Sequence, residues 1–348
     1  MPLLTISEVK RAAQEGQGRA EVRFHAQAEA VVQKQTRDGK PFWELTAADA
    51  EAKLTLRAWS DSPAFAACAG LVPGAFLEIE GEFSSHPAFG VEARRWTCRP
   101  LEGEEIEQLL GGPEALREKQ ARDSDAIAEA VAALADPRLR GLCRLLLEDF
   151  GDRFRRTAAA RTYHHARRGG LVEHVAQMIR AAQILAEVYP ALNGDLLVAG
   201  VLFHDIGKLW ENCPEPRGFA MPFDERGELI GHIAIGIEVL NALWRKLLAL
   251  PEAEAWSGLT PGNEAVRNHL IHLIAAHHGE MEFGSPVYPK TPEAFALHYL
   301  DNLDAKLEMM AAGYQTGTPL APRIIERVRP LPANLVVPLE KFVPPASA

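Results

Sequence analysis

Histidine and aspartate residues recur beside apolar helical segments in the second half of this 348-residue sequence. The apolar run from 196 to 203 ends directly in His204-Asp205. Burying a carboxylate beside an imidazole costs free energy unless a partner offsets both groups. A single His-Asp dipeptide indicates nothing by itself, so its interpretation depends on what other segments bring to the same place.

Four further segments place a histidine or an aspartate on, or beside, an apolar stripe of helical period. These residues are His174, His232, His277, His278, Asp301 and Asp304. Each alone has an ordinary reading, as a hydrogen-bonded core histidine or as an aspartate paired with a basic residue. Several imidazoles and carboxylates converging from different helices need a common counter-charge, which a divalent metal supplies. Mixed His and Asp ligation without Cys suits Mn, Fe, Co or Zn better than Ca or Mg alone.

Lys208 and Gly207 follow the His-Asp pair closely. Lys208 lies four residues after His204, so both side chains project from one helix face. A cation there could hold a phosphate beside a metal, or it could be a solvated lysine at a helix C-terminus. Gly207 permits close approach of backbone or substrate, or it ends the helix.

The elements that must position these residues are helical. Residues 139–318 read as an all-α helical bundle, and Thr291-Pro292 is an N-cap signal before its last helix. The preceding residues 102–138 are expected to form a helical connector. The ends of the chain are an N-terminal segment, residues 1–19, and an extended Pro-rich tail, residues 319–348.

Residues 20–101 alternate with a period of two over several short strands, which favours a small β-barrel such as an OB-fold. In the first strand one face is expected to hold Val22, Phe24, Ala26, Ala28, Ala30 and Val32. Lys53, Arg57 and Trp59 are expected on one face of a later strand, where they suit backbone contact and base stacking of a single strand. The alternatives are that aromatic residues pack the barrel, or that this surface docks the helical domain or another subunit.

Six arginines precede His174 without an acidic residue among them: Arg153, Arg155, Arg156, Arg161, Arg167 and Arg168. Such a run beside a metal site suits a phosphodiester backbone, and a solvated helix face or loop is the alternative. Within it, we expect His164, His165, Arg167 and Arg168 to contact substrate.

The composition is that of an ordinary globular protein, with 47% hydrophobic residues and a net charge of -10. Because the net charge is negative, the protein has no overall positive field that would indicate binding of nucleic acid. A local basic groove is still compatible with this net charge. Neither a signal peptide nor a membrane span is expected. The four cysteines form no C-x-x-C pair and read as reduced thiols, so we expect a cytoplasmic protein.

These residues resemble a known family. The order His174, His204-Asp205, Asp301, with "HDIGK" after a hydrophobic helix, is similar to the HD-domain metal-dependent phosphohydrolases. His232 and His277 resemble the HD subgroup with two metals. The resemblance narrows to the YhaM-type 3′→5′ exoribonucleases in "YHHARRGGLVEHV", "AGVLFHDIGKLWE", "GELIGHI" and "AAHHGEMEFGSPVYPKTPEAFALHYLDNLDAKLEMM", behind a barrel with "GKPFWELTAAD". It covers about residues 20–315 and implies an OB-fold followed by an HD domain.

The resemblance also implies roles for individual residues. One metal would be held by His174, His204, Asp205 and Asp301. Asp205 would bridge to a second metal held by His232 and His277, with His278 as a competing candidate. Two metals about 3.5–4 Å apart lower the pKa of a shared water and stabilise the attacking and leaving oxygens at phosphorus. Lys208 would offset charge on the phosphoryl oxygens, and Asp304 is expected among the substrate contacts.

The function expected from these residues and the resemblance is a phosphodiesterase with two divalent metals, Mn²⁺ first and Fe²⁺, Co²⁺, Zn²⁺ or Mg²⁺ as alternatives. It would degrade single-stranded RNA, and also DNA as an extension, from the 3′ end to nucleoside monophosphates. A second reading is an HD phosphohydrolase of small or cyclic nucleotides, with the barrel as an oligomerisation module. A third is a non-catalytic nucleic-acid-binding scaffold. The resembled family suggests a homo-oligomer, and no membrane partner is expected.

Overall fold

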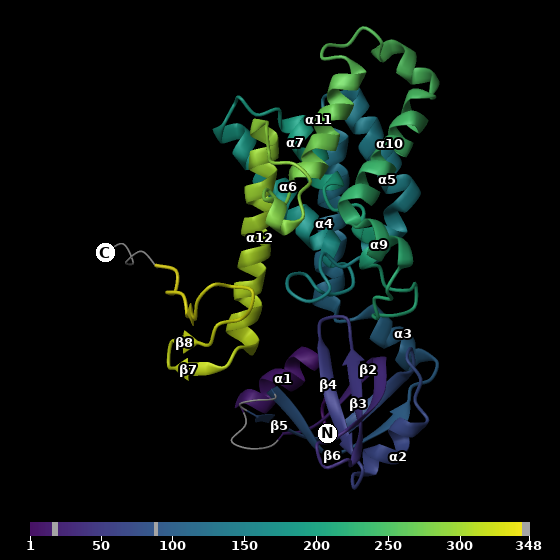
Figure 1. Ribbon diagram of the computed structural model, residues 1–348, viewed down its shortest axis with the longest axis vertical. Helices are drawn as coiled ribbons and strands as arrows, with labels where there is room; N and C mark the ends of the chain where they lie inside the picture. The colour runs from purple at the N-terminus through teal and green to yellow at the C-terminus, as the bar shows by residue number, and fades with distance from the viewer. Residues whose placement is uncertain (16–19, 87–89, 343–348) are drawn as a thin grey trace, which may run out of the picture.

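The computed structural model describes residues 1–15, 20–86 and 90–342. Figure 1 shows a β-rich half below and a helical half above, joined by α3 (Glu104–Gly111) and α4 (Glu114–Ala133). Residues 16–19 of the expected N-terminal segment and residues 343–348 of the expected tail lie outside the described residues. No helix among the described residues is long and apolar enough to cross a membrane.

The β-rich half contains a six-stranded sheet in which five antiparallel strands follow the order β4-β3-β2-β5-β6. The strands are β2 (Ala20–Gln35), β3 (Pro41–Ala48), β4 (Lys53–Trp59), β5 (Phe76–His86) and β6 (Gly90–Pro100). The sixth, β1 (Leu3–Leu4), pairs in parallel with β2. No backbone ladder closes the sheet between β4 and β6 in the described part of the chain, but Trp96 Nε1 of β6 donates to the carbonyl of Arg57 at 3.0 Å.

The alternation expected for the first strand holds only as far as Ala28. Val22, Phe24, Ala26 and Ala28 are buried as predicted. The register of β2 against β3 then shifts between Ala28 and Ala30, and Val32 is 46% exposed. A β-bulge adds one residue to a strand, and this exchanges the two faces beyond it. The expectation that Val32 shares the buried face was therefore wrong.

Two helices that the alternation pattern did not indicate complete this half. The first is α1 (Ile6–Glu15), whose Ile6, Val9 and Ala13 are buried in the core of the sheet. The second, α2 (Pro63–Ala69), lies between β4 and β5 and buries Cys68 there. The N-terminal segment is thus part of the same hydrophobic core as the strands.

The helical half has one large core. Its helices are α5 (Pro137–Arg156), α6 (Gly170–Val188), α7 (Gly194–Phe203), α8 (Lys208–Glu211), α9 (Glu225–Ile230), α10 (His232–Leu248), α11 (Asn263–Ala276) and α12 (Pro292–Thr316). Short 3₁₀ turns span Pro251–Trp256 and Met281–Phe283. The predicted N-cap at Thr291 is confirmed, since its Oγ1 accepts from the backbone N–H of Ala294 at 3.2 Å.

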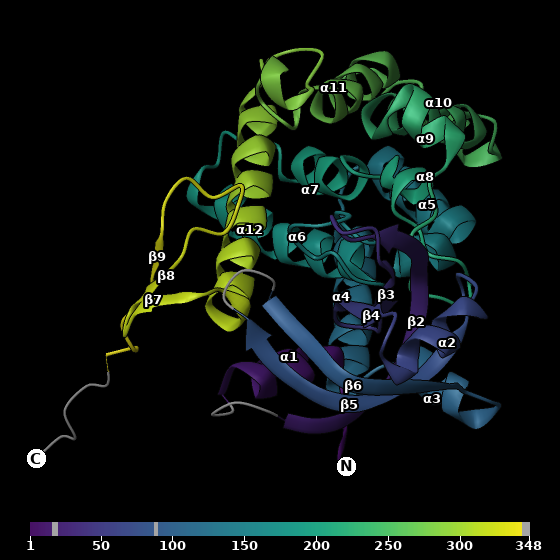
Figure 2. The ribbon, with the colours of Figure 1, turned by 60° about the horizontal axis from the view of Figure 1, so that its bottom comes forward.

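The tail forms three short strands, β7 (Pro319–Ala321), β8 (Ile324–Ile325) and β9 (Leu335–Val336), paired in that order. Ile325, Leu331 and Leu335 pack in a small cluster against the end of α12. The extended tail expected from the prolines therefore has a minor sheet of its own, visible beside α12 in Figure 2.

The loop from 212 to 224 connects the helical half to the β-rich half. Phe219 is buried beside Ala48, Ala50 and Leu101 of the β-rich half. Its backbone N–H donates to Gln27 Oε1 at 2.7 Å. The six-stranded sheet thus docks directly onto a loop that follows the helix of Lys208.

Candidate metal centre

His204 and Asp205 lie in the turn between α7 and α8, at the centre of the helical half. His204 is fully buried and Asp205 is 2% exposed. A Cβ on Gly207 would lie 1.9 Å from the carbonyl oxygen of His232. Only glycine therefore lets the first residue of α10 come this close to the turn.

His174, His204 and Asp301 surround one oxygen of Asp205. His174 Nε2 lies 3.3 Å from His204 Nε2 and 3.4 Å from Asp301 Oδ1. Asp205 Oδ2 lies 3.3 Å from His204 Nε2 and 3.9 Å from His174 Nε2. His174 comes from α6 and Asp301 from α12, so distant segments supply the four residues expected at one metal.

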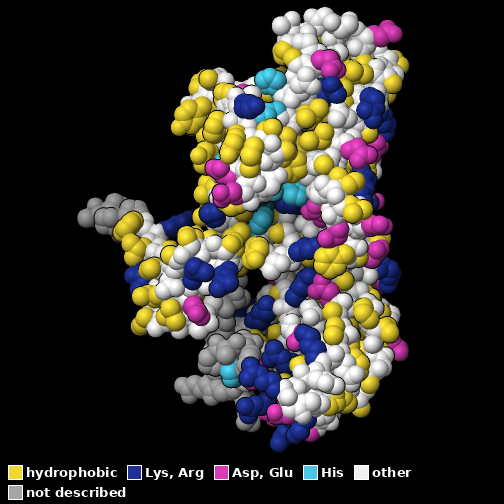
Figure 3. All heavy atoms as spheres, in the orientation of Figure 1, with side chains coloured by type: hydrophobic (Ala, Val, Ile, Leu, Met, Phe, Trp, Pro, Cys, Tyr) yellow, Lys and Arg dark blue, Asp and Glu magenta, His cyan; other side chains and the backbone are white. Residues whose placement is uncertain are grey.

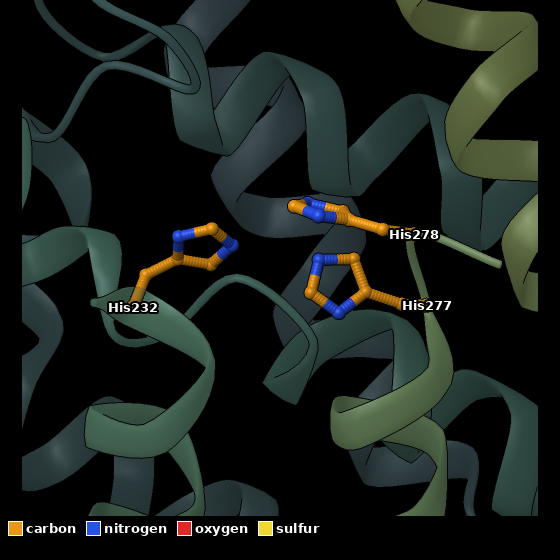
Figure 4. A group of neighbouring side chains, drawn as sticks. All are labelled: His232, His277 and His278. Atoms are coloured by element: carbon orange, nitrogen blue, oxygen red, sulfur yellow. The ribbon is translucent and has the colours of Figure 1, made fainter. Parts of the chain in front are cut away.

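The other oxygen of Asp205 faces a second group, which consists of His232, His277 and His278. Asp205 Oδ1 lies 3.6 Å from His277 Nε2 and 3.8 Å from His232 Nε2. Ring nitrogens of His232, His277 and His278 lie within 4.8 Å of one another. Figure 4 shows these three rings around a common space, with His232 on one helix and the other two following another. The sequence left His277 and His278 as competing candidates, and the structure brings both to the group.

The atoms at this centre fit a pair of cations. Two ligand atoms that each lie 2.0–2.2 Å from a metal are about 3.0–3.6 Å apart, close to the spacing in the first group. Asp205 Oδ1, His232 Nε2 and His277 Nε2 are buried and have no hydrogen-bond partner among the described residues. Such unpaired buried atoms are rare because they cost free energy. A cation at each group would satisfy them, and Asp205 offers one oxygen to each.

Backbone carbonyls set the orientation of two of these rings. His204 Nδ1 donates to Val201 O at 2.7 Å, and His277 Nδ1 donates to Ile274 O at 2.8 Å. A carbonyl oxygen can only accept, so the lone pair of each ring lies on Nε2, the atom turned to the centre. A ring held in this way is ready to bind a metal.

Carboxylates hold two other rings. Asp304 Oδ2 accepts from His174 Nδ1 at 2.7 Å and lies 3.1 Å from His165 Nε2. Glu211 Oε2 lies 3.3 Å from His232 Nδ1. Sequence reasoning placed Asp304 among the substrate contacts, and the structure places it behind His174, where it contacts the ring nitrogen that faces away from the cluster.

The electrostatics of the centre keep its carboxylates ionised. Burial lowers the pKa of His174, but hydrogen bonds to Asp301 and Asp304 outweigh burial and raise it to about 9. Burial raises the pKa of Asp205, yet the charge of Lys208 and neighbouring imidazoles hold it well below its usual range. The carboxylates therefore stay ionised, and a metal would compete with a proton for His174.

Known proteins are similar to this chain in sequence. The family model described as "HD domain" matches residues 171–306. A 3′-5′ exoribonuclease YhaM of Geobacillus sp. (strain WCH70) is 30% identical over 294 residues, which cover 84% of this chain and 81% of that protein. The 3′-5′ exoribonuclease YhaM of Bacillus subtilis (strain 168) is 30% identical over 298 residues, 84% of each chain. This chain belongs to the YhaM family. The family resemblance expected from the sequence is confirmed.

In this member of the YhaM family, Lys208 and His164 adjoin the first group, which consists of His174, His204, Asp205 and Asp301. Lys208 Nζ lies 2.5 Å from Asp205 Oδ2. The His164 ring lies 5.7 Å from the His174 ring, and both of its nitrogens are buried without a hydrogen-bond partner among the described residues. Burial and the charge of Lys208 lower the pKa of His164 to about 4, so the ring is neutral near pH 7.

Several arginines of the run bind loop carbonyls or pair with carboxylates of the protein itself. The Arg168 guanidinium donates to the carbonyls of residues 215, 216 and 218, each at 3.0 Å. Arg161 donates to the carbonyls of Glu211, Met221 and Pro222. Arg167 pairs with Glu173 at 2.7 Å and with Glu308 at 3.1 Å. His165 is 2% exposed beside Asp304. Substrate contact by Arg167, Arg168 and His165 stays a prediction.

A groove of 350 Å³ crosses the β-rich half of this YhaM-family chain between β4 and β6. Arg57 and Trp59 line it from β4, and Arg94 and Arg95 line it from β6. Trp59 is 43% exposed. Lys53 is not part of the lining, and its Nζ pairs with Glu29 Oε1 at 2.6 Å. Figure 3 shows Lys and Arg side chains gathered on this half, below the hollow that separates it from the helices.

Sequence reasoning missed Glu211, Arg94 and Arg95. Glu211 follows Asp205 by six residues on the short α8, and that spacing after "HD" was the available signal. The two arginines are adjacent in "EARRWTC", and strict alternation would place adjacent residues on opposite faces of a strand. Arg95 has a φ of +49° beside a register shift in the β5–β6 pairing, which breaks the alternation and brings both into the groove lining.

Proposed function

We propose that this YhaM-family chain is a metal-dependent 3′→5′ exoribonuclease that releases nucleoside monophosphates from single-stranded RNA. The observation that carries the proposal is the position of Asp205, with Oδ2 toward His174 and His204 and Oδ1 toward His232 and His277. A carboxylate between two imidazole groups suits a two-metal phosphodiesterase. The 3′→5′ polarity and the RNA substrate rest on the relatives, which are named 3′-5′ exoribonucleases.

His174, His204, Asp205 and Asp301 would hold one cation, and Asp205 with His232, His277 and His278 would hold the other. When bound, two such cations lower the pKa of a water nucleophile and neutralise charge on the phosphoryl oxygens. Imidazole and carboxylate donors without cysteine favour Mn²⁺, with Fe²⁺, Co²⁺, Zn²⁺ and Mg²⁺ as alternatives.

The residues of the chain itself position the phosphodiester. Lys208 Nζ lies against Asp205 Oδ2, so it contributes fixed positive charge where charge develops on the phosphoryl oxygens. His164 is a neutral imidazole beside Lys208 and His174, and its uncommitted nitrogens can donate to or accept from a substrate oxygen. Asp304 and Glu211 keep His174 and His232 in the orientation that turns Nε2 to the centre.

The strand path would continue onto the β-rich half, which we propose to be an OB-like, partly open barrel. Arg57, Arg94 and Arg95 suit phosphate contacts, and Trp59 offers an exposed ring for stacking. The proposed division of the chain is a segment at 1–19, a nucleic-acid-binding domain at 20–101, a connector at 102–138, an HD domain at 139–318 and a tail at 319–348. Since α1 shares the core of the sheet, it would move with that domain.

The test is hydrolysis of a 5′-labelled single-stranded RNA 20-mer with Mn²⁺. Stepwise shortening from the 3′ end, stopped by a blocked 3′ end and not by a blocked 5′ end, is the expected result. Asp205→Ala removes the carboxylate shared by both groups and should abolish the reaction. Asp125→Ala, at an exposed site on α4, is the matched control and should behave as wild type. Hydrolysis of mononucleotides or cyclic nucleotides with no action on the 20-mer would overturn the assignment.

A further inference from the structure

Exposed aromatic side chains lie on two segments that also carry histidines of the metal centre. Phe283 follows His278 by five residues, and its side chain is 63% exposed. Tyr163 directly precedes His164 and is 52% exposed. Single exposed rings are ordinary on protein surfaces, but two exposed rings on segments that also supply histidines to one polar centre indicate what could bind beside that centre.

The backbone of Phe283 is in contact with the second histidine group. Its carbonyl oxygen accepts from His278 Nδ1 at 2.6 Å, while the rest of the His278 ring faces His232 and His277. Gly284, the next residue, has a φ of +94°, so the chain turns sharply at this point. The Phe283 ring is therefore attached within one side-chain length of the second group and extends into solvent.

Tyr163 directly precedes a histidine that adjoins the first histidine group. The ring of the next residue, His164, lies 5.7 Å from that of His174, which contacts His204 and Asp301. The two aromatic residues thus belong to two different segments, one with a histidine next to His174 and the other with a histidine of the second group. Figure 3 shows histidine side chains reaching the surface in the middle of the molecule, with hydrophobic side chains next to them.

We propose that Phe283 and Tyr163 stack on the two bases that flank the scissile phosphodiester at the 3′ end of a single strand. The inference rests on the proposed function and deepens it by naming the recognised part of the substrate. Stacking uses the flat face that all bases share, so it tolerates any sequence. That property suits an enzyme that removes successive nucleotides of different identity.

The chemistry between the rings favours a nucleotide over a protein partner. A docked apolar protein surface would bury the imidazoles and carboxylates of the centre without pairing them, which is costly. A nucleotide supplies both kinds of contact, an apolar base at each ring and an anionic phosphate near Lys208. A duplex end lacks unpaired bases to offer the two rings, so the same geometry selects single strands.

The experiment compares RNA 12-mers that differ in one base. Three substrates carry an abasic site at the 3′-terminal position, at the penultimate position or at both, and a fourth is intact. Phe283→Ala and Tyr163→Ala should each lower kcat/KM on the intact strand about tenfold, because each substitution removes the aromatic ring on which one base stacks. Each variant should lose little further activity when the base that its ring contacts is missing, because the two changes remove the same interaction.

Two controls separate stacking from a structural effect. Phe295→Ala and Tyr299→Ala remove rings of the same kinds, 50% and 66% exposed, from the part of α12 that precedes Asp301. Both should keep wild-type activity on all four strands. Calorimetric titration with Mn²⁺ should give the same affinity for Phe283→Ala as for wild type, because alanine keeps the carbonyl that holds His278.

An equal loss of activity on intact and doubly abasic strands would overturn the inference, as would weaker Mn²⁺ binding by Phe283→Ala. Either result would mean that the rings shape the site and do not contact bases. If wild type degraded none of the RNA strands, the proposed function itself would fail, and this outcome differs from a wild type that is active but insensitive to abasic sites.

Discussion

Glu211 holds His232 at two points. Its Oε1 accepts from the backbone N–H of His232 at 2.6 Å, and its Oε2 lies 3.3 Å from the Nδ1 of the same ring. Burial raises the pKa of Glu211, but hydrogen bonds and the charge of His232 outweigh burial and lower it. An ionised carboxylate at Nδ1 directs the Nε2 lone pair toward Asp205, so Glu211 acts on the metal centre through His232.

Glu211→Ala should therefore weaken metal binding at the His232 group about 10- to 100-fold, the usual loss when a partner behind a ligand is removed. Titration calorimetry with Mn²⁺ should then show one tight and one weakened site. Glu211→Gln keeps an acceptor for the backbone N–H and should recover part of the affinity. Glu238→Ala, which removes an exposed partner of Arg226, serves as the control. Unchanged affinity in Glu211→Ala would contradict this role.

Asp304→Asn distinguishes positioning from substrate contact. If Asp304 acts through His174 Nδ1, the substitution should lower kcat roughly tenfold or more and leave KM for RNA within about twofold. A residue that touched substrate would instead raise KM. Steady-state kinetics on labelled RNA makes the distinction, and a raised KM with unchanged kcat would restore Asp304 to the substrate contacts.

Arg94→Ala and Arg95→Ala test the groove between β4 and β6. Each should raise KM for a 20-mer and reduce the slope of log affinity against log salt by about one, as expected for one lost phosphate contact. A trimer too short to reach from the metal centre should be cleaved equally by both variants and by wild type. Arg155→Ala is a suitable control, because Arg155 is exposed and pairs with Asp152 away from the groove.

Removal of metal should destabilise the helical half. Binding to the native state alone stabilises it by about 2.7 kcal/mol at a free metal concentration one hundred times Kd. Chelation should therefore lower the thermal unfolding midpoint of wild type, and Mn²⁺ should restore it. Asp205→Ala lacks the shared carboxylate, so its midpoint should respond little to chelation. Equal responses of the two proteins in differential scanning calorimetry would contradict the assignment of Asp205.

Asp136 and Arg138 form a pair that sets acid stability far from the metal centre. Burial raises the pKa of Asp136, but the hydrogen bond from Arg138 and two backbone N–H groups outweigh burial and lower it. The stabilisation is thus present above the ordinary aspartate pKa of 3.8 and is lost as the pH falls below that value.

Asp136→Ala should destabilise the native state by roughly 3–5 kcal/mol at pH 7, because it leaves the Arg138 charge buried and removes the N-cap of α5. Urea unfolding at pH 7 and pH 3 measures the effect. The difference between variant and wild type should shrink at pH 3, and a constant difference would show that the charge of Asp136 is immaterial.

Residue types and spacing were sufficient to predict a set of candidate ligands that the structure brings together. His174, His204, Asp205, His232 and Asp301 each lie on, beside or directly after an apolar helical stripe, which faces the core of a helical bundle. The alternation of β4 was equally informative, since Leu54, Leu56 and Ala58 are buried there while Thr55 and Trp59 are exposed. In both cases the signal is the period of a regular element, which a sequence carries locally.

Periodicity does not predict which face a residue occupies where a strand departs from its ideal geometry. The bulge after Ala28 turned Val32 outward, and the irregular backbone at Arg95 brought two adjacent arginines into one groove. A bulge depends on how two strands pair, so the sequence of one strand does not reveal it.

The sequence by itself determined which residues are candidates to bind metal, because apolar periodicity requires each helix to have a buried face and polar residues on or beside it stand out. Only the tertiary structure decided which atom meets which. It placed both His277 and His278 beside His232, turned Asp304 toward His174 Nδ1, and engaged Arg168 with carbonyls nearly fifty residues away. These contacts join segments distant in the chain, and their partners are fixed by the packing of helices and loops, which no local pattern encodes.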